Sequence, residues 1–319
     1  MDIAASSDEK VFSTPPKEKV KKIGAMEIQK AAEAIHNRRN ATQKIVFTFL
    51  YIAAAINGLA LFIIIFFMLK NGLSAINWTF LTDVPRDAMT KGGIFPCIIG
   101  TIYLGFGAIL VALPIGVASA IYLNEYAKPG RILRIIRLGI NNLAGVPSVV
   151  FGLFGLAFFV IYLKMGVSIA AGALTLGAIT LPVIIGSTEE ALKTVPDTYR
   201  EASLALGATK WQTIWRVLLP AALPGILTGA ILGLSRAAGE TAPIMFTAAA
   251  FFVPEKLPSS IFSKIMALPY HIYVLATAGT EIEATRPLQY GTALVLIALV
   301  LGMNLLAIIW RSRLRRKLK

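Results

Sequence analysis

The sequence predicts an all-α, polytopic integral membrane protein with six transmembrane helices. Hydrophobic residues make up 56% of its 319 residues, only 15% are charged, and the mean hydropathy is +0.71. Soluble domains carry about 25% charged residues, so this composition is typical of a chain that lies in a bilayer. The basic residues behind the net charge of +14 lie between apolar runs and at the two ends, which favours membrane orientation over nucleic-acid binding.

Six apolar runs are long enough to cross the hydrocarbon of a membrane. They cover residues 45–69, 94–123, 138–163, 167–186, 225–249 and 290–310. Residues 1–44 are expected to form a cytoplasmic N-terminal tail, partly disordered. After a transmembrane domain over 45–310, the basic residues 311–319 are expected to form a cytoplasmic C-terminus, because six crossings return the chain to one side. The apolar part of 252–286, with His271, is too short to cross and is expected along the membrane interface.

The fifth predicted helix carries two charges, Arg236 and Glu240. A charge at the centre of a spanning helix costs roughly 3 kcal/mol or more, so the pair is expected to serve transport or to pair structurally. At about 100° per residue, both charges share a stripe with mostly small residues, which indicates a face along a passage. These small residues are Gly225, Thr228, Gly229, Gly233, Gly239, Pro243 and Thr247. We expect Arg236 to hold an oxyanion transiently and Glu240 to keep the binding weak. The alternative is a structural ion pair between helices, and Pro243 predicts a helix break near the pair.

A charged amphipathic segment over 189–220 precedes this helix. It predicts two short helices joined at a turn near Gly207, where glycine allows a tight turn. The segment has an apolar surface expected from Leu204, Leu206, Trp211, Ile214, Trp215, Val217 and Leu218. This surface either docks a partner or rests on lipid headgroups.

The same segment resembles the EAA signature of permease subunits of binding-protein-dependent ABC importers. The match consists of Glu201-Ala202-Ser203, Gly207, Val217 and Leu219-Pro220, with Ser203 and Val217 as mild departures. Five further stretches resemble the PstA-type permeases of phosphate importers, and GETAP favours that type over its PstC-type companion. They are GGIFPCIIGTIYL (92–104), ALPIGVASAIYLNEYA (112–127), AGVPSVVFGLFGL (144–156), SRAAGETAPIMFT (235–247) and LPYHIYVLA (268–276). The tail over 1–44 lies outside the resemblance.

The resemblance implies a MetI-like ABC importer permease fold with its core over about 92–310. The segment 189–220 would couple to an ATPase through Glu201, Ala202 and Gly207. Gly225, Gly229, Gly233 and Gly239 would pack against the companion permease. Implied partners are a PstC-like companion, a PstB-like ATPase dimer and a PstS-like external binding protein. The expected function is the permease subunit of an ATP-driven importer of inorganic phosphate in the bacterial inner membrane.

The sequence offers no catalytic chemistry. It lacks the phosphate-binding pattern G-x-x-x-x-G-K-[ST], so ATP-Mg is expected on the partner ATPase, and this chain is expected to be no enzyme and to hold no cofactor or metal. His36 and His271 are its only histidines. Two other transport functions stay open: a permease for sulfate or molybdate, and a proton-coupled secondary carrier that uses the Arg236–Glu240 pair. The carrier leaves the EAA-like segment unexplained.

Overall fold

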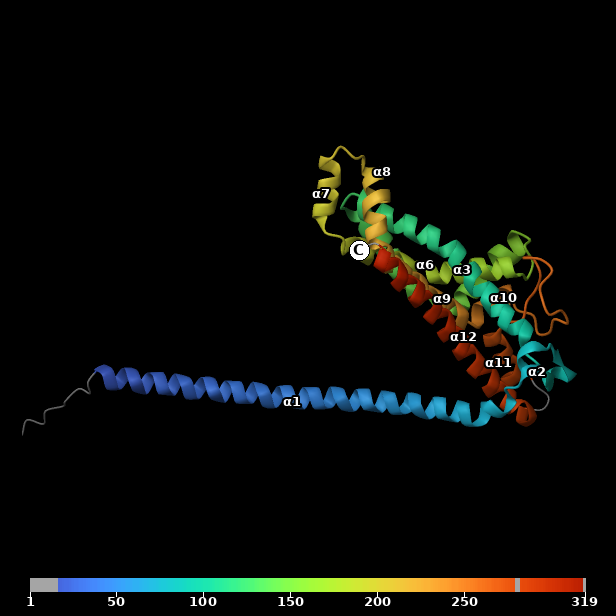
Figure 1. Ribbon diagram of the computed structural model, residues 1–319, viewed down its shortest axis with the longest axis horizontal. Helices are drawn as coiled ribbons and strands as arrows, with labels where there is room; N and C mark the ends of the chain where they lie inside the picture. The colour runs from blue at the N-terminus through green and yellow to red at the C-terminus, as the bar shows by residue number, and fades with distance from the viewer. Residues whose placement is uncertain (1–16, 279–281, 318–319) are drawn as a thin grey trace, which may run out of the picture. The chain divides into compact units, whose positions relative to one another are not determined.

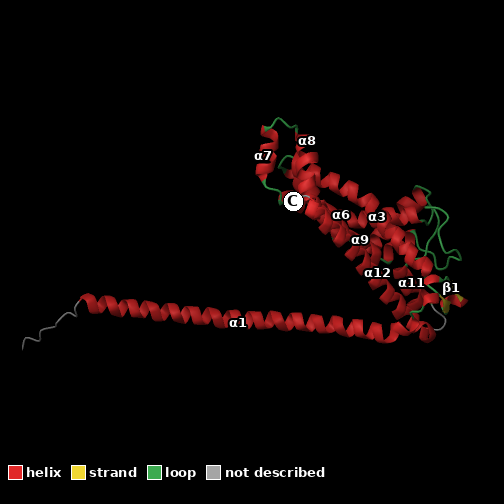
Figure 2. Cartoon of the chain, viewed as in Figure 1, coloured by secondary structure: helices red, strands yellow, loops and turns green. Residues whose placement is uncertain are grey.

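The computed structural model describes residues 17–278 and 282–317, most of them helical (Figure 2). The chain divides into two compact units, residues 1–65 and 66–319. The predicted all-α class is confirmed, since the one sheet among the described residues pairs two strands of two residues each, β1 (Pro85–Arg86) and β2 (Lys91–Gly92).

The helix α1 (Lys17–Gly72) runs without a break through the predicted boundary at residue 44. Residues 17–44 of the expected tail are helical, residues 1–16 lie outside the described residues, and the cytoplasmic position of the tail stays a prediction. The physical reason is composition: this stretch is rich in Lys, Glu, Gln and Ala, which favour a helix and extend one that the apolar segment has nucleated. The apolar side chains between 45 and 69 are mostly exposed, as expected for contact with lipid.

Four helices make the main bundle of the second unit. They are α3 (Phe95–Ile121), α6 (Ile169–Lys193), α9 (Leu219–Gly239) and α12 (Ile282–Lys317). The first three pack on one another, and α12 packs on α9 (Figure 1). Small and branched side chains close the core between them, among them Ala108, Leu176 and Ile184, each no more than 1% exposed.

Five described helices are long and apolar enough to cross a membrane. The predicted span over 138–163 is instead a bent pair, α4 (Arg131–Ala144) and a second arm made of α5 (Ser148–Gly155) and the π-helical turn η4 (Leu156–Tyr162). The arms meet at 99°, and counting the pair as one span gives six. The bend follows from Pro147, which disfavours helical backbone in the residue before it and cannot donate a backbone hydrogen bond.

Shorter elements gather at one end of the second unit, while α7 (Asp197–Ala205) and α8 (Lys210–Thr213) lie at the other (Figure 1). The first group comprises η1 (Leu73–Ala75), α2 (Trp78–Thr82), β1, η2 (Asp87–Met89), β2, α10 (Ala242–Thr247) and α11 (Leu268–Thr277). The C-terminal end of α12 lies on the side of α7 and α8 (Figure 1). The two ends of the bundle therefore carry different structures.

One face of the helix α11 is buried inside the unit, and the expectation that the helix lies along the membrane interface stays a prediction. It packs on α12 and α3, and Leu268, Val274 and Leu275 are at most 3% exposed. The buried hydroxyl of Thr101 accepts a hydrogen bond from the Leu268 amide at 2.9 Å and fixes the start of α11. Burying this face removes apolar surface from water and stabilises the unit, whereas Tyr273 on the other face is 46% exposed.

His271 lies within this buried layer, beside a cavity of about 10 Å³ bordered by Phe80 and Met89. Its Nδ1 atom has no hydrogen-bond partner among the described residues. Burial lowers the pKa of His271 to about 4, because an apolar site penalises the charged imidazolium.

The stability of this layer is therefore expected to depend on pH. In the unfolded chain the pKa of histidine is about 6.5, so between pH 6.5 and 4 the unfolded state binds the extra proton and the folded state loses stability as the pH falls. The loss should reach on the order of 3 kcal/mol at pH 4. Thermal unfolding of the detergent-purified wild type and His271→Gln between pH 4 and 8 measures it. A wild-type curve no steeper than that of the variant would contradict the prediction.

Candidate functional site

The two charges of the predicted passage meet at the end of α9. The helix stops at Gly239, Glu240 adopts extended backbone, and α10 begins at Ala242 with Pro243 in its first turn. Pro243 thus starts a new helix, as the predicted break near the pair requires. Arg236 Nε and Glu240 Oε1 are 3.6 Å apart, and the two side chains are 35% and 17% exposed.

This ion pair leaves the guanidinium largely available. The separation exceeds the 2.7–2.9 Å typical of a charge-assisted hydrogen bond, and Arg236 makes no hydrogen bond to another side chain or carbonyl within the described part of the chain. Glu240 also borders a cavity of about 10 Å³ with Thr101 and Ile244, space for at most one water. A half-exposed arginine held by one carboxylate can bind an anion and release it.

The glycine face of α9 is used inside the chain. A Cβ atom added at Gly225 would lie 2.4 Å from Ala191 Cβ, and one at Gly229 would lie 2.6 Å from Ser187 Cβ, both on α6. A Cβ atom added at Gly233 would lie 3.2 Å from Ile109 of α3 and 3.5 Å from Ile184 of α6. The prediction that these three glycines meet a companion permease is therefore corrected, because α6 covers Gly225 and Gly229, and α3 and α6 cover Gly233. Gly239 has open space around it and stays a prediction.

Replacing Gly229 by valine is expected to separate α9 from α6 and to destabilise the chain by about 1–3 kcal/mol, as overpacked helix contacts do. The measurement is the thermal unfolding midpoint of the chain purified without partners. Gly139→Val on α4 is the matched control, since a Cβ atom there meets nothing within 4 Å. Destabilisation seen only in an assembled complex would contradict packing within the chain.

Within the segment 189–220, whose first residues end α6, lies a helical hairpin, which we call the coupling hairpin and define as α7, the turn at 206–209 and α8. Gly207 has φ +82°, a left-handed conformation that glycine adopts without strain. The Thr209 side chain and Gln212 form a reciprocal cap on α8, which continues through the π-helical turn η5 (Ile214–Leu218) into α9. The predicted turn is confirmed.

The residues predicted to contact an ATPase lie on the exposed surface of the coupling hairpin. Glu201, Ala202 and Gly207 are all exposed, and Leu206 is 89% exposed. The predicted apolar surface divides in two: Leu204, Leu206, Trp211 and Trp215 are exposed, whereas Ile214 and Leu218 are buried against α3 and α6. One side of the segment fixes the hairpin and the other is available for docking.

A buried ion pair ties the hairpin to the end of α3. Arg200 Nη2 donates to Glu125 Oε1 at 3.0 Å, and the two side chains are only 19% and 9% exposed. Glu125 belongs to the π-helical turn η3 (Tyr122–Tyr126) that follows α3. Arg200 also donates to the carbonyl oxygens of Val195 and Leu192 at 3.0 and 3.1 Å, so nearly all its donors are used.

Two further contacts complete this anchor. The Lys210 ammonium donates to the Glu125 carbonyl oxygen and lies 4.8 Å from the centre of the Tyr126 ring. The hydroxyls of Ser203 and Thr213, 2.9 Å apart, join α7 to the helix after the turn. The hairpin and the end of α3 therefore form one rigid connection.

Residues 112–319 match the family described as "Binding-protein-dependent transport system inner membrane component". This chain belongs to that family. The permease is 33% identical over 275 residues to "Phosphate transport system permease protein PstA" of Xylella fastidiosa (strain 9a5c), with 86% of this chain and 94% of the relative covered. It is 35% identical over 267 residues to "Probable ABC transporter permease protein YqgI" of Bacillus subtilis (strain 168), with 80% and 88% covered.

A solved structure confirms the fold. The inward-facing methionine ABC transporter MetNI superposes with a TM-score of 0.51 at 22% identity, and the match covers 71% of the permease and 94% of the solved chain. The predicted resemblance to PstA-type permeases with a MetI-like fold is confirmed by these relatives. The permease is accordingly a multi-pass transport component of the inner membrane.

Sequence reasoning missed the contact between Glu125 and Arg200. Glu125 is the one acid in an otherwise basic loop over 124–137, and Arg200 directly precedes the EAA-like motif. The single acid among basic residues could have drawn attention to Glu125. Its partner Arg200 is 75 positions away, however, and no local sequence pattern predicts that the two side chains meet. Within the described ranges, no group of His, Cys, Asp and Glu side chains could hold a metal ion.

Proposed function

We propose that this permease is the membrane subunit of an ATP-driven importer of inorganic phosphate and lines its translocation path. Relatives that cover most of the chain are named phosphate transport system permeases, including a probable one of Methanocaldococcus jannaschii at 35% identity over 259 residues. Arg236 supplies the bidentate donor that an oxyanion needs, which supports this substrate class. Sulfate and molybdate share that chemistry but have no support among these relatives.

The observation that carries the proposal is the continuity of one helix. Residues 210–239 form a single apolar span from the coupling hairpin to the Arg236–Glu240 pair. At 1.5 Å per residue, Lys210 and Arg236 are about 40 Å apart along it. A displacement of the hairpin by an ATPase therefore reaches the charged pair through a rigid element, which is the basis of alternating access in this proposal.

The partners follow from the exposed surfaces. Glu201, Ala202 and Gly207 would contact a PstB-like ATPase dimer, which binds ATP-Mg and carries out its hydrolysis. A PstC-like permease would form the other half of the path, and a PstS-like external protein would deliver phosphate. The basic end of α12 lies on the side of the coupling hairpin, which supports a cytoplasmic C-terminus (Figure 1). A cytoplasmic N-terminus belongs to the same proposal.

Phosphate uptake into proteoliposomes tests the function. The permease is reconstituted with its companion and ATPase, and the binding protein is added outside. We expect uptake of labelled phosphate only with internal ATP-Mg and the binding protein, without competition by sulfate or molybdate. Uptake driven by a proton gradient without the ATPase would establish a secondary carrier instead. Uptake of sulfate or molybdate at equal rates would overturn the proposed substrate.

A further inference from the structure

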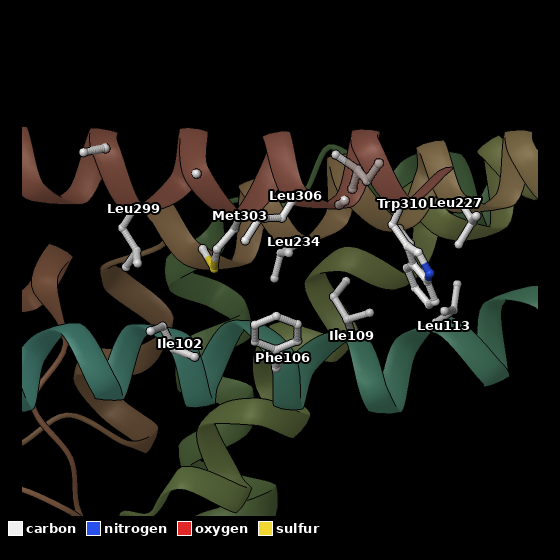
Figure 3. Close-up of a pocket in the computed structure, with 15 residues that line it drawn as sticks. Ile102, Phe106, Ile109, Leu113, Leu227, Leu234, Leu299, Met303, Leu306 and Trp310 are labelled. Carbon is white, nitrogen blue, oxygen red and sulfur yellow. The ribbon is translucent and has the colours of Figure 1, made fainter. Parts of the chain in front are cut away.

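An apolar groove runs along the outside of the helical bundle between α3, α9 and α12. Its volume is about 740 Å³, within the range of pockets that hold small molecules. Ile102 and Leu299 lie near one end, and Leu113, Leu227 and Trp310 gather at the other (Figure 3). All its lining side chains are apolar apart from the ring nitrogen of Trp310.

The groove is separate from the proposed phosphate path. Leu227 and Arg236 both belong to α9, and at about 100° per residue they point about 180° apart. Gly225 and Gly229, which pack on α6, likewise point away from the groove. The groove therefore belongs to the face of α9 that looks toward α12 and the lipid.

The length of the groove fits one leaflet of the bilayer. The helix α12 rises about 16 Å between Leu299 and Trp310, about half of the roughly 30 Å hydrocarbon thickness. An acyl chain extends through one leaflet, whereas a spanning helix needs the full thickness. The dimensions favour a lipid chain as the occupant, and filling the groove recovers the dispersion contacts that an empty groove would lose.

The end of the groove at Trp310 is positively charged. Arg311 follows Trp310 on α12, and its Nη1 atom donates to Thr228 Oγ1 at 2.6 Å, which leaves the other donors of the guanidinium open. Arg313 is exposed close by. Among the residues that the structure describes, no carboxylate is in ion-pair range of either arginine. Tryptophan is typical of the headgroup level, and basic pockets between spanning helices bind anionic headgroups.

We propose that this groove binds an anionic phospholipid, with one acyl chain between α3, α9 and α12 and the headgroup phosphate at Arg311 and Arg313. The lipid joins α12 to α9 through the groove, where protein contacts alone leave a gap. The site requires both an apolar chain and a phosphate on one molecule, which distinguishes it from a site for free inorganic phosphate.

Lipid retention tests the proposal. The full-length permease, purified with its partners, is equilibrated with detergent micelles that contain phosphatidylglycerol or phosphatidylcholine, and bound lipid is counted by mass spectrometry. We expect about one phosphatidylglycerol per permease and a roughly 30-fold weaker affinity for it in Arg311→Gln/Arg313→Gln. Arg216→Gln, which changes an exposed arginine of η5, should retain wild-type affinity. Equal retention of the two lipids would overturn the proposal, as would displacement by millimolar inorganic phosphate.

A second experiment identifies the occupant without weakening the fold. A photo-reactive phenylalanine analogue is placed at Leu306, which lines the groove and is 70% exposed. We expect its main cross-link in native membranes to be a phospholipid. A main cross-link to α1 of the same chain, to a second copy or to the companion permease would assign the groove to a helix and overturn the proposal.

Discussion

Phosphate uptake is expected to fall roughly 10- to 100-fold when Arg236 is replaced by glutamine. A hydrogen bond to a charged group contributes about 1.5–3 kcal/mol, and glutamine keeps the size of the side chain without its charge. Lysine at this position keeps the charge but loses the planar fork, so Arg236→Lys should show an intermediate rate. Uptake of labelled phosphate by the reconstituted complex, normalised to inserted permease, gives these values.

A second variant separates the two effects of breaking the Arg236–Glu240 pair. Glu240 stays half-buried without its cation in Arg236→Gln, so the double variant Arg236→Gln/Glu240→Gln shows whether the loss comes from the missing anion site or from an uncompensated carboxylate. We expect uptake by the double variant to stay as low as that of Arg236→Gln. Arg131→Gln changes an exposed arginine of α4 in the same way and should transport normally. Recovery of uptake in the double variant would leave Arg236 with a structural role only.

Loss of the Glu125–Arg200 pair is expected to uncouple ATP hydrolysis from transport. Breaking one partner of a buried ion pair costs about 3–5 kcal/mol, and here it loosens the coupling hairpin from the end of α3, where the Lys210 contacts remain. In Glu125→Gln the hairpin can still contact the ATPase, because Glu201, Ala202 and Gly207 are on its other surface. We therefore expect the ATP hydrolysed per phosphate taken up to rise about tenfold.

The ratio of hydrolysis to uptake separates coupling from stability, since an unstable permease lowers both rates together. Asp197→Asn is the matched control: Asp197 also pairs with Arg200, at 2.9 Å, but is 86% exposed, and exposed pairs contribute at most about 1 kcal/mol. Arg200→Gln should raise the ratio as Glu125→Gln does, and the double variant should add little to either. An unchanged ratio in both single variants would show that the pair only stabilises the fold.

Much of the fold was predictable because its signals are local. The apolar runs, the turn at Gly207 and the break near Pro243 each depend on a few neighbouring residues. The bend at Pro147 was visible as a break within the predicted third span, but its angle of 99° depends on how α5 packs against α6 and α10. The burial of one face of α11 was missed for a related reason, since apolar side chains such as Leu268 and Val274 look the same whether lipid or protein covers them.

The sequence by itself determined that the chain crosses a membrane, that a charged pair interrupts one crossing and that an EAA-like hairpin precedes it. Only the tertiary structure decided what covers each face: α6 covers Gly225 and Gly229, and Arg200 reaches Glu125. The physical reason is that helical periodicity fixes which residues share a face, through backbone geometry within a few turns. The partner of that face depends on packing between segments far apart in the chain, which periodicity does not specify.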